Sequence, residues 1–181
     1  MTEPAGARGY PAAVLKLRPL LPADEEPFRA GHAQLAAEGV IFGLRLERGT
    51  RWDEYLRLIS DQRAGLNLPD GQVPSTFLVA EAAGEIVGRV SIRHHLNEFL
   101  RRYGGHIGYA VLPAHRRRGH ATEILRQSLI IARSLGIDRV LMTCDDDNAG
   151  SIAVIESCGG RLTAVAPGDP GRAETRHYWI D

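Results

Sequence analysis

One segment restricts the fold of this chain more than any other: an apolar strand that runs through a basic turn into a helix. The strand is predicted over His106 to Leu112, and the turn contains three consecutive arginines, Arg116, Arg117 and Arg118. From Gly119 to Leu135, small and apolar residues recur three and four positions apart, which predicts a helix. Gly136 follows as a typical C-terminal stop.

The rest of the chain predicts further strands and helices around this segment. Apolar patterns predict strands over Val14 to Arg18, Thr76 to Glu81, Glu85 to Arg93, Arg161 to Ala166 and Arg176 to Ile180, and a buried-type strand over Arg139 to Cys144. Helical spacing predicts helices over Pro22 to Ala37, Arg51 to Ala64 and Asn148 to Cys158. Because strands alternate with helices in the middle and hairpins lie at the flanks, we expect an α/β fold with a mixed sheet covered by helices on both faces.

Length and charge limit the classes of protein that fit. A chain of 181 residues suits one domain, which we place over residues 13–181, after a flexible N-terminal tail over residues 1–12. Basic and acidic residues number 22 each, so no overall charge attracts nucleic acid or a membrane surface. No run reaches the roughly 18 apolar residues of a membrane span. With only two cysteines, the chain is expected in a reducing, cytoplasmic compartment.

The basic turn has the chemistry of a phosphate site. The first backbone N–H groups of a helix have no internal partner, and the helix dipole adds positive charge there. Gly119 lets a ligand approach the backbone, and the small Ala121 leaves room beside it. The arginines can pair with phosphate oxygens. A solvated basic turn before an ordinary helix is the alternative.

Order and spacing favour the first interpretation. Arg116-x-x-Gly119-x-Ala121, after an apolar strand, resembles the pyrophosphate-binding signature of the GNAT superfamily of acyl-CoA-dependent N-acyltransferases. Asn148, with Ser151 three residues later, matches the start of a later helix in that family. The resemblance covers most of the chain from Val14 onward. It implies a mostly antiparallel central sheet whose fourth and fifth strands splay apart.

The resemblance also implies acetyl-CoA as the acyl donor. Its pantetheine arm would lie between the splayed strands, lined by Tyr109, Ala110 and Val111. Its pyrophosphate would be held by the turn and the start of the helix, that is by Arg116, Arg117, Arg118, Gly119, His120, Ala121 and Thr122. Asn148 and Ser151 would contact it from the later helix, although Asn148 also suits a helix N-cap.

The implied reaction is direct attack of an amine on the thioester, with a backbone N–H near Val111 stabilising the oxyanion. Many relatives have a Tyr seven residues after the Asn that protonates the leaving thiolate, but Ile155 stands there. A thiol with a pKa of about 8.5 leaves without that proton, whereas an ammonium with a pKa of about 10.4 must first lose one. His106 is therefore the candidate base. A histidine that only hydrogen-bonds the adjoining turn is the alternative.

The acceptor is expected to be an amine of a small molecule or a peptide. His94, Asn97 and Cys144 are predicted to contact it, although Cys144 also suits a small buried residue at a strand end. The seven histidines show no metal-like spacing, so no metal site is expected, and the protein is expected to be a monomer or a homodimer. A noncatalytic acyl-CoA-binding or regulatory module is the main rival, because of Ile155. A nucleotide-binding protein is disfavoured because both common glycine-rich phosphate motifs are missing.

Overall fold

The computed structural model describes residues 14–168 and 173–181, so the predicted tail lies outside it. The strands are β1 (Lys16–Arg18), β2 (Ser75–Ala82), β3 (Glu85–Arg93), β4 (Ile107–Val111), β5 (Val140–Asp145), β6 (Arg161–Ala166) and β7 (Thr175–Ile180). The α-helices are α1 (Glu25–Ala36), α2 (Trp52–Ala64), α3 (His120–Ser134) and α4 (Ala149–Ser157). Three short helical turns are η1 (Pro22–Asp24), the π-helical η2 (Leu100–Gly104) and η3 (Pro113–His115). None of the helices in the described residues is long and apolar enough to cross a membrane.

The predicted elements are all present, with ends shifted by a few residues. The strands form two antiparallel sheets, one in the order β1-β2-β3-β4 and one in the order β5-β7-β6. The division falls between β4 and β5. This confirms the predicted α/β fold with splayed fourth and fifth strands.

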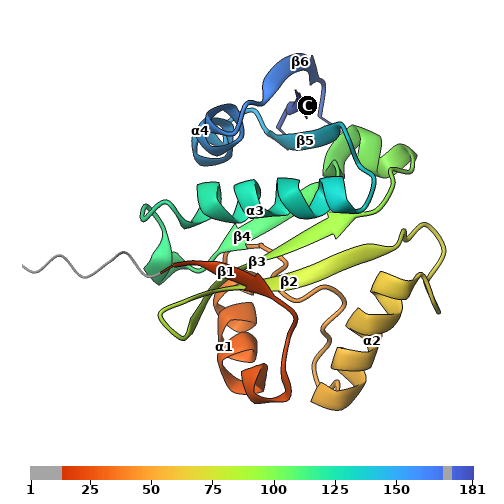
Figure 1. Cartoon of the computed structure of the whole chain (residues 1–181), viewed down its shortest axis with the longest axis vertical. Helices are drawn as coiled ribbons and strands as arrows, with labels where there is room; N and C mark the ends of the chain where they lie inside the picture. The colour runs from red at the N-terminus through yellow and green to blue at the C-terminus, as the bar shows by residue number, and fades with distance from the viewer. Residues whose placement is uncertain (1–13, 169–172) are drawn as a thin grey trace, which may run out of the picture.

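Helices cover both faces of the first sheet, as predicted, with α3 on one face and α1 and α2 on the other (Figure 1). The core under α3 contains Ile124 together with Ile92 from the first sheet and Met142 from the second, so it holds the two sheets together. The core on the opposite face is aromatic, with Phe28 of α1 packed between Phe42 and Trp52. These two cores hold in place the strands on either side of the gap between β4 and β5.

The two sheets are joined where β4 and β5 begin. The backbone N–H of His106 donates to the carbonyl of Leu141 at 2.7 Å, and the N–H of Leu141 donates to Nδ1 of His106 at 2.8 Å. Gly105 has a φ of +59°, and a Cβ there would lie 2.5 Å from the Leu141 oxygen, so this close approach requires glycine. From this junction the two strands diverge.

Candidate active site

β4 presents to the gap between the sheets a backbone edge with which no strand pairs in the residues that the structure describes. The N–H of Leu112 donates to the Val87 carbonyl at 2.9 Å, so the even-numbered residues of β4 face β3. Alternate residues of an antiparallel strand point their backbone groups in opposite directions. The backbone groups of Ile107, Tyr109 and Val111 therefore face β5, and β3 is the only strand paired with β4 in residues 14–168 and 173–181.

The same alternation separates Ala110 from its two predicted partners. Ala110 lies opposite Arg89 of β3, and its buried side chain packs in the aromatic core on the α1 and α2 side. Three consecutive strand residues cannot all direct backbone groups to one side. The backbone groups of Tyr109 and Val111 thus face the gap, whereas those of Ala110 face β3, and the predicted contacts with a pantetheine arm stay predictions.

A cavity of about 220 Å³ opens where β4 and β5 diverge. The residues lining it come from β3, η2, β4, β5 and α4: Arg93, Tyr103, Gly104, Ile107, Gly108, Tyr109, Met142, Thr143, Ser151 and Ile155. Ile107 and Tyr109 belong to the α3 side of the sheet, whereas Gly108 lies on the opposite face. The cavity thus connects the two faces through the gap. A larger hollow of about 450 Å³ between α3 and the end of α4 contains none of the predicted site residues.

The turn before α3 forms an anion-binding arrangement of backbone amides. Within the part of the chain that the structure describes, the N–H groups of Arg117 to Thr122 have no hydrogen-bond partner. Arg117 and Gly119 have φ values of +61° and +80°, and left-handed residues in such a turn direct successive N–H groups toward one point. A Cβ at Gly119 would meet nothing within 4 Å, so this side of the turn is open.

The three arginines of the turn differ in their surroundings. Nη2 of Arg116 lies 2.6 Å from a carboxylate oxygen of Glu38, and its Nε donates to the Val111 carbonyl at 3.2 Å. Arg117 and Arg118 are exposed. The side chain of Arg116 thus braces the turn against the end of α1, which leaves Arg117 and Arg118 as the arginines available to a ligand.

His120 and Asn148 lie at the starts of α3 and α4. Burial, together with the nearby His115 and Arg118, lowers the pKa of His120, which favours the neutral ring. Oδ1 of Asn148 accepts a hydrogen bond from the N–H of Ser151 at 3.0 Å, which confirms the N-cap. The predicted contacts of these residues with acetyl-CoA stay predictions.

Among the β4 residues that line the cavity, Tyr109 is the one with a polar side chain. Its hydroxyl is buried and has no hydrogen-bond partner among the described residues. Burial raises the pKa of Tyr109 to about 12, and the nearby Ser151 only partly opposes this rise. The hydroxyl therefore stays protonated, and Tyr109 lines the same cavity as Ile155 of α4.

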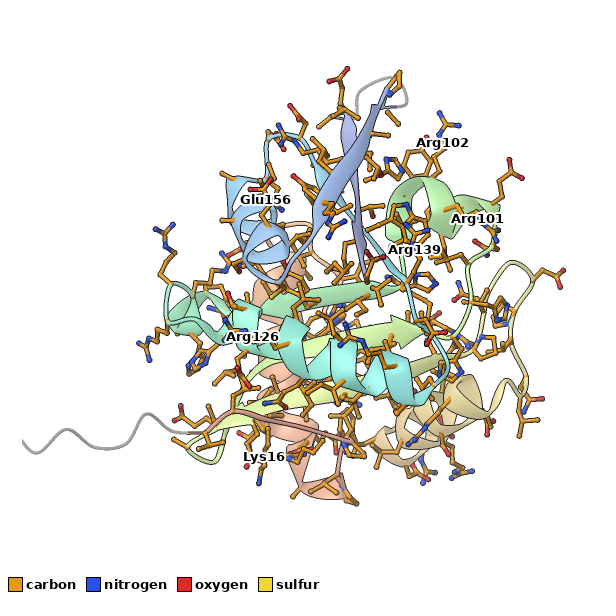
Figure 2. The ribbon with its side chains drawn as sticks, turned by 45° about the horizontal axis from the view of Figure 1, so that its top comes forward. Lys16, Arg101, Arg102, Arg126, Arg139 and Glu156 are labelled. Carbon is orange, nitrogen blue, oxygen red and sulfur yellow. The ribbon has the colours of Figure 1, made fainter. Side chains whose placement is uncertain are left out.

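His106 is held in a way that does not fit the predicted base. Because Nδ1 accepts a hydrogen bond from Leu141, the neutral ring carries its proton on Nε2. A proton taken up at Nδ1 would break that bond. Burial, followed by the charges of Arg93 and of Arg101 on η2 (Figure 2), lowers the pKa of His106 to about 4. The geometry supports the structural alternative, with β5 as the partner in place of the turn.

His94 and Asn97 organise the segment between β3 and η2. Nε2 of His94 lies 2.9 Å from the Thr76 hydroxyl. Asn97 accepts from the N–H of Leu100 at 2.9 Å and donates to the Gly71 carbonyl at 2.8 Å. Neither side chain lines the cavity, so the structure places these two predicted acceptor-binding residues away from it.

Cys144 also lies outside the cavity lining. It packs against the core under α3, and burial raises the pKa of its thiol to about 11. A thiol that stays protonated is a poor nucleophile. Its neighbour Thr143 does line the cavity, and its hydroxyl donates to the Tyr103 carbonyl at 2.8 Å.

Arg93 is a site residue that the sequence patterns did not single out. It is the one charged residue among those lining the cavity, and its Nη1 donates to the Gly104 carbonyl at 2.9 Å. A Cβ at Gly108 would lie 3.0 Å from that nitrogen, so glycine leaves the guanidinium uncovered. The sequence did contain a signal for this residue. Arginines 89 and 93 lie four positions apart, and so on one face, of a strand that we expected to be covered by helices on both faces.

Comparisons with known proteins agree with this geometry. The family model described as the acetyltransferase (GNAT) family matches residues 45–159. Since the match spans more than half of the sequence, the chain belongs to the acetyltransferase (GNAT) family, a family of acyltransferases. A comparison with curated protein sequences finds no match.

Solved structures share the fold at low sequence identity. A putative acetyltransferase, yncA from Salmonella typhimurium with acetyl-CoA, is 21% identical over 92% of each chain, with a TM-score of 0.60. Spermidine N-acetyltransferase from Vibrio cholerae, in complex with CoA and spermine, is 19% identical over 92% of this chain and 94% of that chain, with a TM-score of 0.64. An acetyltransferase from Agrobacterium tumefaciens is 24% identical over 99% of each chain, with a TM-score of 0.59.

Proposed function

We propose that this protein is an N-acetyltransferase that moves an acetyl group from acetyl-CoA to an amine of a small molecule or peptide. One observation carries the proposal: the cavity between β4 and β5 lies on the open backbone edge of β4, and this strand leads to the unpaired amides of residues 117–122. Family membership supports the reaction class. The acetyl-CoA and CoA in the Salmonella and Vibrio structures support the donor.

The residues present fit acetyl-CoA. The amides at the start of α3, with Arg117 and Arg118, suit a pyrophosphate. The backbone groups of Tyr109 and the N–H of Val111 can pair with a pantetheine arm as a neighbouring strand would, whereas the Val111 carbonyl is bonded to Arg116. Bound acetyl-CoA supplies an activated acyl thioester. Binding, orientation and charge stabilisation fall to the chain.

The chain's own groups suit a direct transfer. A backbone N–H of Tyr109 or Val111, aimed into the gap, stabilises negative charge that develops on the thioester oxygen. The acceptor amine reaches the gap from the face on which Gly108 and Arg93 lie. With acetyl-CoA bound, the Tyr109 hydroxyl, which has no partner in the described residues, would be available to donate a hydrogen bond to the thioester sulfur, the role for which Ile155 has no suitable group.

No side chain that lines the cavity is an evident base. The lining residues include no Asp, Glu or His. With His106 bonded to Leu141, the acceptor loses its proton to water or enters as the neutral amine. A transfer of this kind becomes faster as pH rises toward the pKa of the acceptor.

Two measurements test the proposed function. Acetyl-CoA or CoA should raise the melting temperature by mass action on the folded state, whereas ATP and NAD at equal concentration should have a much smaller effect. A screen of amines with acetyl-CoA should then release free thiol with at least one acceptor. Binding of acetyl-CoA without thiol release from any amine would favour a noncatalytic acyl-CoA-binding module instead.

A further inference from the structure

Two arginines of β3 lie on the acceptor face of the sheet without a carboxylate partner. Arg89 and Arg93 are four residues apart and share one face of the strand. Burial, and then the charge of Arg93, lowers the pKa of Arg89 to about 10, and burial also lowers the pKa of Arg93. In residues 14–168 and 173–181, neither guanidinium is paired with a carboxylate. The hydroxyl of Tyr55, near Arg89, has no hydrogen-bond partner among them either.

Partly buried charge without a counter-ion costs folding free energy. The cavity offers no internal compensation, because its lining contains no acidic residue. A protein tolerates such a cost where a ligand supplies the opposite charge. The acceptor face therefore has room and charge for an anion.

The hydrogen bonds of the two arginines show which of them a ligand can reach. Arg89 donates from Nη1 to the Gly108 carbonyl at 2.8 Å and from Nη2 to the Ile41 carbonyl, so it is used to anchor the segment between α1 and α2. Arg93 donates to backbone carbonyls from Nη1 alone, at 2.9 Å to Gly104. Its Nε and Nη2 have no partner in the described chain. This planar edge matches the two oxygens of a carboxylate.

We infer that the acceptor is an amine that also carries a carboxylate, which the Nε–Nη2 edge of Arg93 binds while Arg89 adds positive potential. This inference rests on the proposed function and names the substrate class of the same site. One guanidinium edge pairs with two oxygens and balances the single charge of a carboxylate. A polycation such as the spermine in the Vibrio structure would instead meet two unpaired guanidiniums.

The same charges explain how an amine reacts in a cavity that lacks a base. Nearby positive charge disfavours an ammonium and lowers its pKa. With the carboxylate held at Arg93, the amine of the same molecule lies close to both guanidiniums. More of the bound acceptor is then neutral at a given pH than of the free acceptor.

Matched acceptors test the inference directly. The wild-type enzyme with acetyl-CoA is assayed by thiol release with L-amino acids, the corresponding amino acid amides, aminoalkylphosphonates and spermidine. At least one amino acid should exceed its own amide in kcat/KM by roughly ten- to a hundredfold, the range expected for a charged hydrogen bond. A preference for amides, phosphonates or spermidine overturns the inference and leaves the acetyltransferase activity intact.

Variants of Arg93 locate the effect. Arg93→Met should reduce the acid-to-amide ratio to near one with unchanged acetyl-CoA affinity, and Arg93→Lys should keep part of it. Arg57→Met is the matched control, because Arg57 is 72% exposed on α2 and pairs with Asp53. A ratio that survives in Arg93→Met, or that falls equally in Arg57→Met, contradicts the assignment.

A binding measurement gives a second readout that does not depend on turnover. With CoA at saturation, acetate, succinate and L-glutamate should stabilise the wild-type protein saturably, and this stabilisation should be absent in Arg93→Met. If no carboxylate stabilises the wild type and no amino acid is acetylated, the inference fails. Failure of acetyl-CoA itself to bind would instead overturn the proposed function.

Discussion

His106 and Leu141 exchange two hydrogen bonds that use different parts of the histidine. The His106 backbone N–H donates to the Leu141 carbonyl at 2.7 Å, and the imidazole Nδ1 accepts from the Leu141 N–H at 2.8 Å. The ring thus takes the place of a backbone acceptor at the point where the sheets separate. The position of the gap between β4 and β5 depends on this side chain.

Substitutions at His106 distinguish a structural role from a proton acceptor. Asn has an oxygen close to the position of Nδ1 and does not titrate, so His106→Asn should keep most of the activity and stability. His106→Ala leaves the Leu141 N–H unsatisfied and should lose roughly 1–3 kcal/mol of stability. Steady-state kinetics and denaturant unfolding check both. If His106→Asn and His106→Ala both lost roughly 10²–10⁴-fold in kcat, with the largest loss at low pH, His106 would be the base.

The pH dependence of stability should reflect the same contact. Because folding lowers the pKa of His106 from about 6.5 to about 4, the unfolded chain binds the extra proton in this window. The contribution is complete above pH 6.5 and is lost as pH falls toward 4, on the order of 3 kcal/mol in total. Unfolding free energies of wild type and His106→Asn, measured between pH 4 and 8, should therefore be similar above pH 6.5 and separate at low pH, where the wild type becomes the less stable of the two. Parallel curves would show that the ring is not held neutral.

Two substitutions at Gly119 distinguish the stability cost of backbone strain from the loss of CoA affinity. Its φ of +80° disfavours a β-branched residue, so Gly119→Val should lose about 1–2 kcal/mol of stability as well as CoA affinity. Asn adopts left-handed conformations more readily, so Gly119→Asn should stay stable and still bind CoA weakly, because its side chain enters the open side of the turn. Calorimetric titration checks the affinities. Normal CoA binding by Gly119→Asn would mean that the phosphates lie elsewhere.

The arginines of the turn should differ in their contribution to CoA affinity. Arg118 is exposed and free to meet a phosphate, so Arg118→Met should weaken CoA binding roughly tenfold and reduce its salt dependence. Arg116 is bonded to Glu38, so Arg116→Met should change the affinity by much less. The reverse order would show that Arg116 leaves Glu38 when CoA binds.

Tyr109 should affect turnover more than binding. Tyr109→Phe removes only the unpartnered hydroxyl, so kcat should fall roughly tenfold at constant CoA affinity, the loss expected for one hydrogen bond to a charged group. Since burial raises the pKa of Tyr109 to about 12, this loss should be constant between pH 6 and 9.5. Ser151→Ala is the control at the nearest polar neighbour. An unchanged kcat in Tyr109→Phe would exclude the hydroxyl from thiolate departure.

Local patterns were sufficient for the fold and for the turn before α3. Arg161–Ala166 and Glu85–Arg93 form strands with the predicted limits, because alternation and turn residues act within a few positions. The order Arg116, Gly119, Ala121 located the unpaired amides for the same reason. These features depend on neighbours in sequence.

The contacts across the gap depend on residues far apart in sequence and were not predicted. Nothing near His106 in sequence reveals Leu141 as its partner, 35 residues away, or Glu38 as the partner of Arg116. The sequence patterns singled out neither Arg89 nor Arg93. Arg89 contacts Ile41 in the segment between α1 and α2, and Arg93 contacts Gly104 of η2, so both surroundings come from residues far away in sequence or from the next loop.

The open edge of β4 has a consequence for how the two halves of the molecule behave. Beyond the junction at His106, no strand pairing joins β4 to β5 in the residues that the structure describes, and core side chains connect the two sheets there. A pantetheine arm lying along Tyr109 and Val111 would then take the place of a strand paired with the open edge of β4. Donor binding would complete a continuous sheet, so its clearest signature would be slowed amide hydrogen exchange along β4, with the two halves unfolding more nearly as one unit.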